Sequence, residues 1–194
     1  RYVQGVTVAP SPAWLKERLE ACGINSISNI VDIANYVMLL TGQPLHAFDA
    51  EKVEGGIVVR PAKAGEKFVS LDRGEYELIR DDLLIADQKG PLALAGIKGG
   101  KRAEVTRETK KIILESANFA PENVERTAKR VNLLTDAAVR FRVGIDPNLT
   151  VEAIDTAASL IQKLAGGEVL KGRVDTGKNV PAHPVKLRLK KAQS

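Results

Sequence analysis

The chain has 194 residues, of which 44% are hydrophobic and 27% are charged, and its net charge is +5. This composition is typical of a folded globular protein and excludes an intrinsically disordered chain. The apolar runs are far shorter than the roughly 20 residues of a membrane-spanning helix, and the N-terminal stretch lacks the apolar core of a signal peptide. The basic charge is compatible with a polyanionic partner, but many proteins without one share it.

Cysteine and histidine are rare in this sequence. Cys22 is the only cysteine, which excludes an internal disulfide and favours a reducing compartment. We therefore expect a cytoplasmic protein with no membrane partner. With one cysteine and two distant histidines, His46 and His183, no zinc-ligand pattern is present and we expect no metal site. The chain starts at Arg1 and stops within a charged run, from which we expect a segment of a longer protein.

Two helices are predicted in the N-terminal part. Ser11 as the N-cap and Pro12 at the first helical position mark the start of the first helix. Cys22 follows the apolar spacing of that helix and is expected in the core. The second helix is predicted over residues 29–40, with its apolar side chains on one face and its end at Gly42.

Short strands dominate the middle of the chain. They are predicted in the segments GIVVR, KFVSL, YELI, LLIADQ and PLALAGI between residues 56 and 97, and again at residues 112–114. Helices return after Pro121, at residues 135–142 and at residues 148–164. Because helices lead, strands cluster and helices return, the order favours an α+β fold with mainly antiparallel pairing over alternating βαβ units.

The last residues are predicted to lie apart from these elements. VPAHP, residues 180–184, has the composition of a linker, which makes His183 a poor catalytic candidate. VKLRLK, residues 185–190, alternates strictly between apolar and basic residues. Such alternation predicts a strand with one face in water.

The segment GQPLHAFD, residues 42–49, places the titratable ring of His46 on a loop that follows a helix end and is stiffened by Pro44. Loops held by a rigid scaffold often carry catalytic side chains. A single histidine, however, is more often a hydrogen-bonded packing residue than a catalytic group. Both interpretations of His46 stay open on this segment alone.

Three further positions allow a structural and a functional interpretation. AGIKGGKR, residues 95–102, lacks the ending of a phosphate-binding loop; we favour a flexible loop over a backbone that approaches a ligand at Gly99. Glu115 is either a solvated carboxylate at a strand end or a hydrogen-bond acceptor at the rim of an apolar pocket. Thr135 or Asp136 is expected as a helix N-cap, which in the functional interpretation lies beside a pocket.

Five segments together resemble, in sequence and in order, the editing module of the beta subunit of bacterial phenylalanyl-tRNA synthetases, the third and fourth domains of that subunit. They are GINSISNIVDIANYVMLLTGQPLHAFD, GGIVVRPAKAGE, LAGIKGG, IILESANFAP and LLTDAAVRFRVGIDP. The resemblance covers residues 11–175. It implies a layered β/β/α architecture in which residues 1–180 form the editing module as two interleaved subdomains. Residues 181–194 would then be a linker and the first strand of the following domain.

The resemblance implies that this module hydrolyses tyrosine wrongly esterified to tRNA(Phe). An apolar synthetic pocket cannot strongly reject an isostere that adds a hydroxyl, so a second site must require that hydroxyl. Glu115 matches the residue that accepts the tyrosine O–H, with the Gly99 backbone nearby. His46 matches the pocket histidine and is expected to orient the water or the ester. We expect His46 and Thr135 to be the catalytic residues. Thr135 and Ala137 match positions that line the amino-acid pocket.

This chain departs from the family pattern at several positions. Asn25 stands where the family often has a pocket arginine, and we expect it among the substrate-binding residues. RFRVG replaces the usual RFERG at Arg142 and Val143, and Ala138 replaces a frequent serine. These changes leave open whether editing is retained.

The resemblance also implies partners and cofactors. The partners are the 3′ end of tRNA(Phe) and the alpha subunit, which carries the synthetic site and completes a heterotetramer. No cofactor is expected in this chain, whereas ATP and Mg²⁺ are expected for the full two-subunit enzyme. Two alternatives stay open: a non-catalytic module that binds tRNA or the other subunit, and a free-standing domain that edits in trans.

Overall fold

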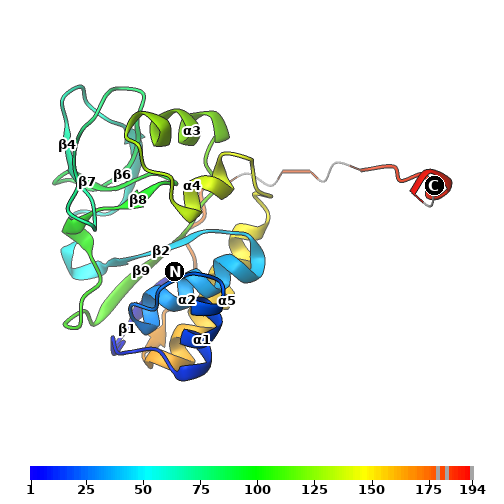
Figure 1. Cartoon of the computed structure of the whole chain (residues 1–194). Helices are drawn as coiled ribbons and strands as arrows, with labels where there is room; N and C mark the ends of the chain where they lie inside the picture. Colours follow the sequence, from blue (N-terminus) through cyan, green and yellow to red (C-terminus); the bar gives the residue numbers. More distant parts are fainter. Residues whose placement is uncertain (178–179, 182–183, 193–194) are drawn as a thin grey trace.

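The computed structural model describes residues 1–177, 180–181 and 184–192, and within them the chain folds into two sheets and a layer of helices (Figure 1). The first sheet, here the central sheet, has the order β10-β1-β9-β2 and is antiparallel throughout. Its strands are β1 (Tyr2–Gln4), β2 (Leu45–Asp49), β9 (Lys111–Ser116) and β10 (Glu168–Val169). The chain leaves this sheet after β2 and returns to it at β9, so the other sheet is an insertion between two adjacent strands.

The second sheet, here the outer sheet, has the order β3-β6-β7-β8 and is also antiparallel. Its strands are β3 (Val58–Pro61), β6 (Leu83–Ala86), β7 (Pro91–Leu94) and β8 (Lys98–Gly99). A separate hairpin pairs β4 (Lys67–Val69) with β5 (Glu75–Glu77). All the strands predicted between residues 56 and 97 are therefore present.

The helices from the two ends of the chain cover the same face of the central sheet. These are α1 (Ala13–Ala21), α2 (Asn29–Thr41) and α5 (Leu149–Ala165), which lie below β2 and β9 in Figure 1. The helices α3 (Pro121–Arg130) and α4 (Asp136–Phe141) lie beside the outer sheet instead. Single 3₁₀ turns follow β2 and β8, at η1 (Ala50–Lys52) and η2 (Lys101–Ala103).

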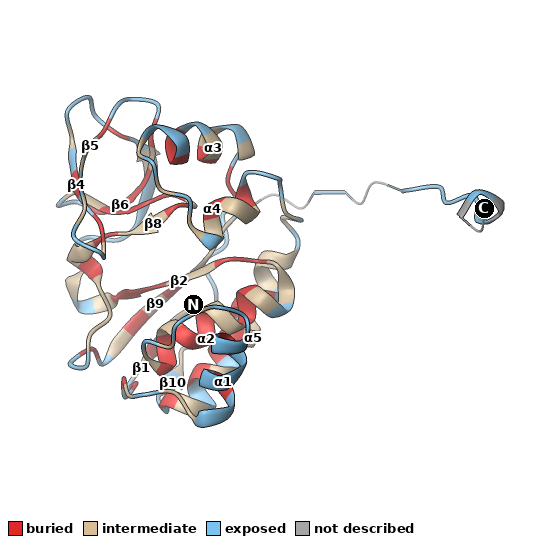
Figure 2. Ribbon diagram, in the orientation of Figure 1, coloured by how far each residue is buried: buried red, intermediate tan, exposed pale blue. Residues whose placement is uncertain are grey.

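Residues of the central sheet alternate between two hydrophobic cores, because successive side chains of a strand point to opposite faces. On β9, Ile112 and Leu114 are buried with the helices, whereas Ile113 packs against the core that contains the outer sheet. On β2, Ala47 belongs to the helical core and Phe48 to the other. Figure 2 shows buried residues on both sides of this sheet. The arrangement confirms the predicted α+β fold with β/β/α layers.

Helix α2 has well-defined ends, and its C-terminal end leads directly into β2. Ser28 is its N-cap, with the Oγ accepting a hydrogen bond from the Val31 N–H at 3.5 Å. Gly42 closes the helix in the left-handed conformation (φ 81°), and its N–H donates to the Met38 carbonyl. The buried Gln43 then donates from Nε2 to the Ala117 carbonyl at 2.8 Å, which joins the end of α2 to the end of β9. The predicted end at Gly42 is confirmed.

Two predictions about α1 are wrong. The N-cap is Pro12 and not Ser11, because the Ser11 Oγ donates to the Asp32 carboxylate at 2.6 Å and is not available to the α1 backbone. Cys22 is exposed and not part of the core. It is the C-cap of α1, where the helical spacing has already ended, whereas Leu15 and Leu19 are buried as the spacing requires.

The strand predicted at residues 185–190 is also wrong. Residues 185–188 are irregular and exposed, and α6 (Leu189–Ala192) follows them. A strand is stabilised by pairing, and none of the described strands pairs with this segment. His183 lies outside the described residues, as does part of the linker predicted around it.

Candidate functional site

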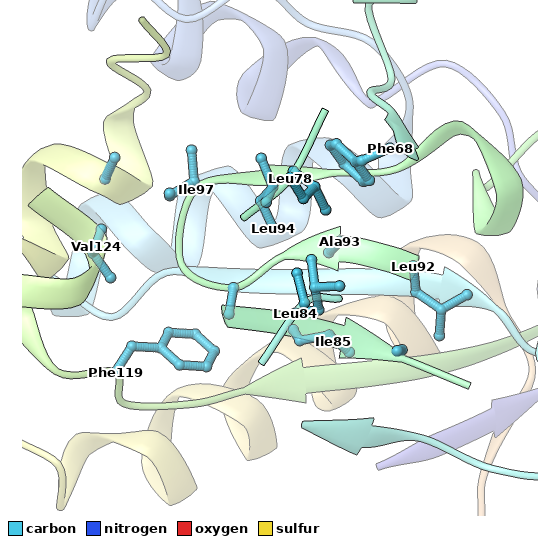
Figure 3. Close-up of a cluster of buried hydrophobic side chains, with 14 of the residues drawn as sticks. Phe68, Leu78, Leu84, Ile85, Leu92, Ala93, Leu94, Ile97, Phe119 and Val124 are labelled. Carbon is cyan, nitrogen blue, oxygen red and sulfur yellow. The ribbon is translucent and has the colours of Figure 1, made fainter. Parts of the chain in front are cut away.

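A pocket opens between the central sheet and the outer sheet, with an empty volume of about 370 Å³ that includes its mouth. Strands β2 and β9 supply one wall, and β7, β8 and the turn between them supply the opposite wall. Phe119 and Phe141 close the side next to α3 and α4, with their rings packed edge to face at 5.2 Å. Most of the lining is apolar, and Figure 3 shows three of the lining residues, Ile85, Ala93 and Phe119, within the cluster of buried hydrophobic side chains.

His46 and Glu115 lie side by side on one wall of this pocket. They are directly paired residues of the antiparallel strands β2 and β9, and both line the pocket. Side chains opposite each other in such a pair are neighbours, with Cβ atoms about 5 Å apart. The alternation along β9 accounts for the position of Glu115, which lies on the same face as Ile113 and away from the helices.

Gly99 of β8 lies against the ring of His46. A Cβ on Gly99 would be 2.5 Å from Cε1 and 2.7 Å from Nε2 of His46, which is closer than real Cβ atoms approach. The Gly99 carbonyl accepts a hydrogen bond from the Leu71 N–H at 3.0 Å, so this backbone is held in place. The favoured interpretation of residues 95–102 as a flexible loop is therefore wrong, because residues 98–99 form a strand of the outer sheet. The close approach seen at Gly99 is to the His46 ring, and an approach of this backbone to a ligand stays a prediction.

Burial gives the two titratable groups unusual pKa values. Desolvation lowers the pKa of His46 to about 4, so its imidazole is neutral at pH 7. Desolvation also raises the pKa of Glu115 to about 7, so its carboxyl is only partly ionised at neutral pH. Among the hydrogen bonds of the described residues, none involves the side chain of Glu115 or His46. Both side chains are thus open to a ligand's hydrogen-bonding groups.

Thr135 and Ala137 hold different positions relative to the pocket. Thr135 is the N-cap of α4: its Oγ1 accepts from the Ala138 N–H at 3.2 Å and donates to the Ile97 carbonyl at 2.8 Å. These two bonds attach α4 to the turn before β8. Ala137, in the first turn of α4, lines the pocket.

The arrangement is a slot suited to a mainly apolar ligand with one hydroxyl or other donor. The carboxyl of Glu115 can accept a hydrogen bond inside the slot, and the neutral ring of His46 can accept or donate one beside it. Sites of this kind, with an apolar lining and few polar groups, typically fix the orientation of a small ligand or side chain. No group of three or more His, Cys, Asp or Glu side chains within the described residues is placed to hold a metal ion.

Comparison with known proteins relates this fold and pocket to a family. The model of the B3/4 domain family matches residues 1–166. The chain belongs to the B3/4 domain family.

Curated relatives of this B3/4 domain are bacterial phenylalanine–tRNA ligase beta subunits. The chain is 49% identical over 191 residues to the beta subunit of Geobacter metallireducens, covering 97% of this chain and 24% of the relative. It is 51% identical over 176 residues to that of Syntrophus aciditrophicus, covering 90% and 22%. It is 50% identical over 167 residues to that of Aquifex aeolicus, covering 86% and 22%. The chain thus spans about a quarter of the length of these relatives.

A solved structure also matches the B3/4 domain. It is an N-terminal fragment of the phenylalanyl-tRNA synthetase beta subunit from Pyrococcus horikoshii, at 17% identity. The match has a TM-score of 0.45 and covers 81% of this chain and 44% of that fragment.

The B3/4 domain brings together four of the six residues selected from the sequence. His46, Gly99, Glu115 and Ala137 line the pocket. Thr135 lies behind the wall, and Asn25 is exposed on the loop between α1 and α2 and is not among the lining residues. The roles assigned to all six stay predictions.

Sequence reasoning missed other lining residues of the B3/4 domain. Lys98 lines the pocket, although within the segment AGIKGGKR only the glycines gave a signal for a ligand site. Phe119 and Phe141 also line it, and no sequence signal distinguished them from other core aromatic residues.

None of the helices in the part of the chain that the structure describes is both long and apolar enough to cross a bilayer.

Proposed function

We propose that this B3/4 domain is the editing site of a phenylalanine–tRNA ligase and hydrolyses tyrosine esterified to tRNA(Phe). The observation that carries the proposal is Glu115, a carboxyl without a hydrogen-bond partner among the described residues, placed in an apolar pocket opposite His46. Its curated relatives are beta subunits of phenylalanine–tRNA ligase, which supports the reaction class.

Selectivity follows from the position of the Glu115 carboxyl, which is partly buried in the pocket wall and is closed off from water when a side chain fills the slot. Tyrosine donates its phenolic O–H to the carboxyl, whereas phenylalanine fills the same slot and leaves the carboxyl without a partner. An unsatisfied buried polar group costs about 1–3 kcal/mol. A difference of that size corresponds to a preference for tyrosine of roughly 5- to 150-fold, since 1.4 kcal/mol is about a factor of ten.

Hydrolysis needs only a positioned water. The water oxygen attacks the ester carbonyl carbon, the bond from that carbon to the ribose oxygen breaks, and the proton lost by the water ends on the ribose oxygen. Free tyrosine and deacylated tRNA leave. His46 is a weak base because burial lowers its pKa to about 4, so it orients the water or the ester by hydrogen bonding and does not remove the proton from water outright. Thr135 contributes by fixing α4, through its bond to the Ile97 carbonyl.

The same proposal names the partners of the domain. The tRNA 3′ end enters the pocket, and an alpha subunit, within a cytoplasmic heterotetramer, attaches phenylalanine to tRNA using ATP and Mg²⁺. That synthetic chemistry lies outside this chain.

Deacylation of tyrosyl-tRNA(Phe) by the ligase that carries this domain tests whether the site is a hydrolase. We expect wild type to release tyrosine and His46→Ala to be slower by about tenfold or more, the size of effect that follows the loss of a positioning group. Glu17→Ala, at an exposed position on α1, is the matched control and should keep the wild-type rate. If wild type releases no tyrosine, the domain is a binding module and the proposal fails.

A further inference from the structure

Lys98 supplies the only positively charged side chain among the described residues that line the pocket at neutral pH, where His46 is neutral. It lies on β8, next to Gly99, and its side chain is 26% exposed. Its Nζ is 3.1 Å from the Oδ2 of Asp72, a carboxylate that is 53% exposed. A half-exposed ion pair thus adjoins a pocket whose lining is mostly apolar.

The charge of Lys98 is directed to Asp72 and not to Glu115. Burial alone shifts the pKa of Glu115, with no contribution from a neighbouring cation. By contrast, the Ser70 hydroxyl and then Lys98 hold the pKa of Asp72 below its usual range. The residues that line the pocket therefore supply two separate polar groups, the carboxyl of Glu115 and the ammonium of Lys98, which is paired with Asp72.

The turn that carries Asp72 is fixed to the same strand as Lys98. The Leu71 N–H donates to the Gly99 carbonyl at 3.0 Å, and Ser70 forms a β-bridge with Gly100. Within the turn, the Arg73 N–H donates to the Ser70 carbonyl at 2.9 Å. Asp72 and Lys98 are consequently held together by backbone hydrogen bonds as well as by their own ion pair.

We propose that Lys98 binds the phosphate of the terminal nucleotide of the ester substrate, and that Asp72 holds the ammonium in place until the phosphate displaces it. The proposal rests on the editing function. An amino acid bound in the pocket against Glu115 and His46 leaves its nucleotide toward solvent, where its phosphate can reach the half-exposed ion pair of Lys98 and Asp72. Exchange is easy because a solvent-exposed ion pair contributes little stability, whereas a phosphate offers more charge and more acceptor oxygens than one carboxylate.

Two stable analogues of the substrate separate this inference from the editing function. Both carry tyrosine joined through an amide to the 3′-nitrogen of 3′-amino-3′-deoxyadenosine, and only one carries a 5′-phosphate. Binding of each to the 194-residue chain is measured by calorimetry. We expect the 5′-phosphate to tighten binding to wild type by roughly five- to tenfold, the effect of one charge-assisted contact near water. Added salt should reduce that gain.

Variants at the ion pair should change the gain in a defined way. Lys98→Met keeps the apolar stem and should abolish it, and Lys98→Arg should retain it. Asp72→Asn removes the competing carboxylate and should increase it. Lys101→Met is the matched control, because Lys101 is an ion-paired lysine just beyond β8 that does not line the pocket; it should leave the gain unchanged.

The outcomes are distinguishable. If both analogues bind wild type equally, or if the gain from the phosphate survives in Lys98→Met, the assignment of Lys98 is wrong while the editing site stands. If neither analogue binds wild type, the editing function is wrong and the inference falls with it.

Discussion

Replacing Glu115 by glutamine should stabilise the fold at alkaline pH, because the native pocket holds a carboxyl that ionises with difficulty. Burial raises the pKa of Glu115 from 4.5 to about 7. A group whose folded pKa lies above its unfolded value contributes stability that is fully present below pH 4.5 and is lost as the pH rises through 7. A tenfold difference in acidity between the folded and the unfolded chain corresponds to about 1.4 kcal/mol. Above pH 8 the buried carboxylate therefore lowers the free energy of unfolding by about 2–3 kcal/mol, allowing for solvent at the pocket mouth.

Urea denaturation of wild type and Glu115→Gln at pH 4 and pH 8 measures this effect. Glutamine has nearly the same shape and no charge, so the variant should exceed wild type by about 2–3 kcal/mol at pH 8 and by little at pH 4. Glu17→Gln, at an exposed position on α1, should give no gain at either pH. If Glu115→Gln is no more stable than wild type at pH 8, or gains equally at both pH values, Glu115 is not a desolvated carboxyl and the selectivity argument loses its basis.

Three other predictions follow from the pocket. Gly99→Ala puts a Cβ 2.5 Å from the His46 ring and should displace that ring. The rate of tyrosyl-tRNA deacylation should therefore fall by about tenfold or more, while the circular dichroism spectrum stays unchanged. An unaltered rate would show that the position of the ring does not matter. The preference for tyrosyl- over phenylalanyl-tRNA should rise from pH 6 to pH 8 as Glu115 ionises, because charge-assisted hydrogen bonds are roughly twice as strong as neutral ones; a preference that is flat or falls over this range contradicts the acceptor role. Thr135→Val removes the N-cap and the hydrogen bond to the Ile97 carbonyl, so the free energy of unfolding should fall by about 1–2 kcal/mol. Thr135→Ser keeps the hydroxyl and should retain most of that free energy. Equal losses in both variants would exclude the hydroxyl as the cause.

The local parts of the fold could be predicted from the sequence, because their signals lie within a few residues. Gly42 marks the end of α2 through its left-handed conformation, and the apolar spacing of α5 corresponds to its buried face. Local patterns failed where a neighbour decides the outcome. Ser11 bonds to the distant Asp32 and not to the start of α1, and the alternating VKLRLK segment has no partner strand among the described residues.

The pocket itself could not be derived from local patterns, because it is made by pairing between distant segments. His46 and Glu115 become neighbours only when β2 and β9 pair around the inserted outer sheet. The approach of Gly99 to His46 depends on how the two sheets pack, which no spacing in the sequence encodes. The sequence singled out these three residues but left a structural and a functional interpretation open; the resemblance to a known family favoured the functional one, and the structure supplies their contacts.

The most direct test of the central claim is the ratio of tyrosyl- to phenylalanyl-tRNA(Phe) deacylation rates, compared between wild type and Glu115→Gln in the ligase that carries this domain. Selection by an unsatisfied carboxyl predicts a ratio of roughly 5 to 150 in wild type. In Glu115→Gln the ratio should fall by about fourfold or more, because the charged acceptor is replaced by a neutral amide that forms a weaker hydrogen bond. A ratio that is the same in both enzymes would contradict the account.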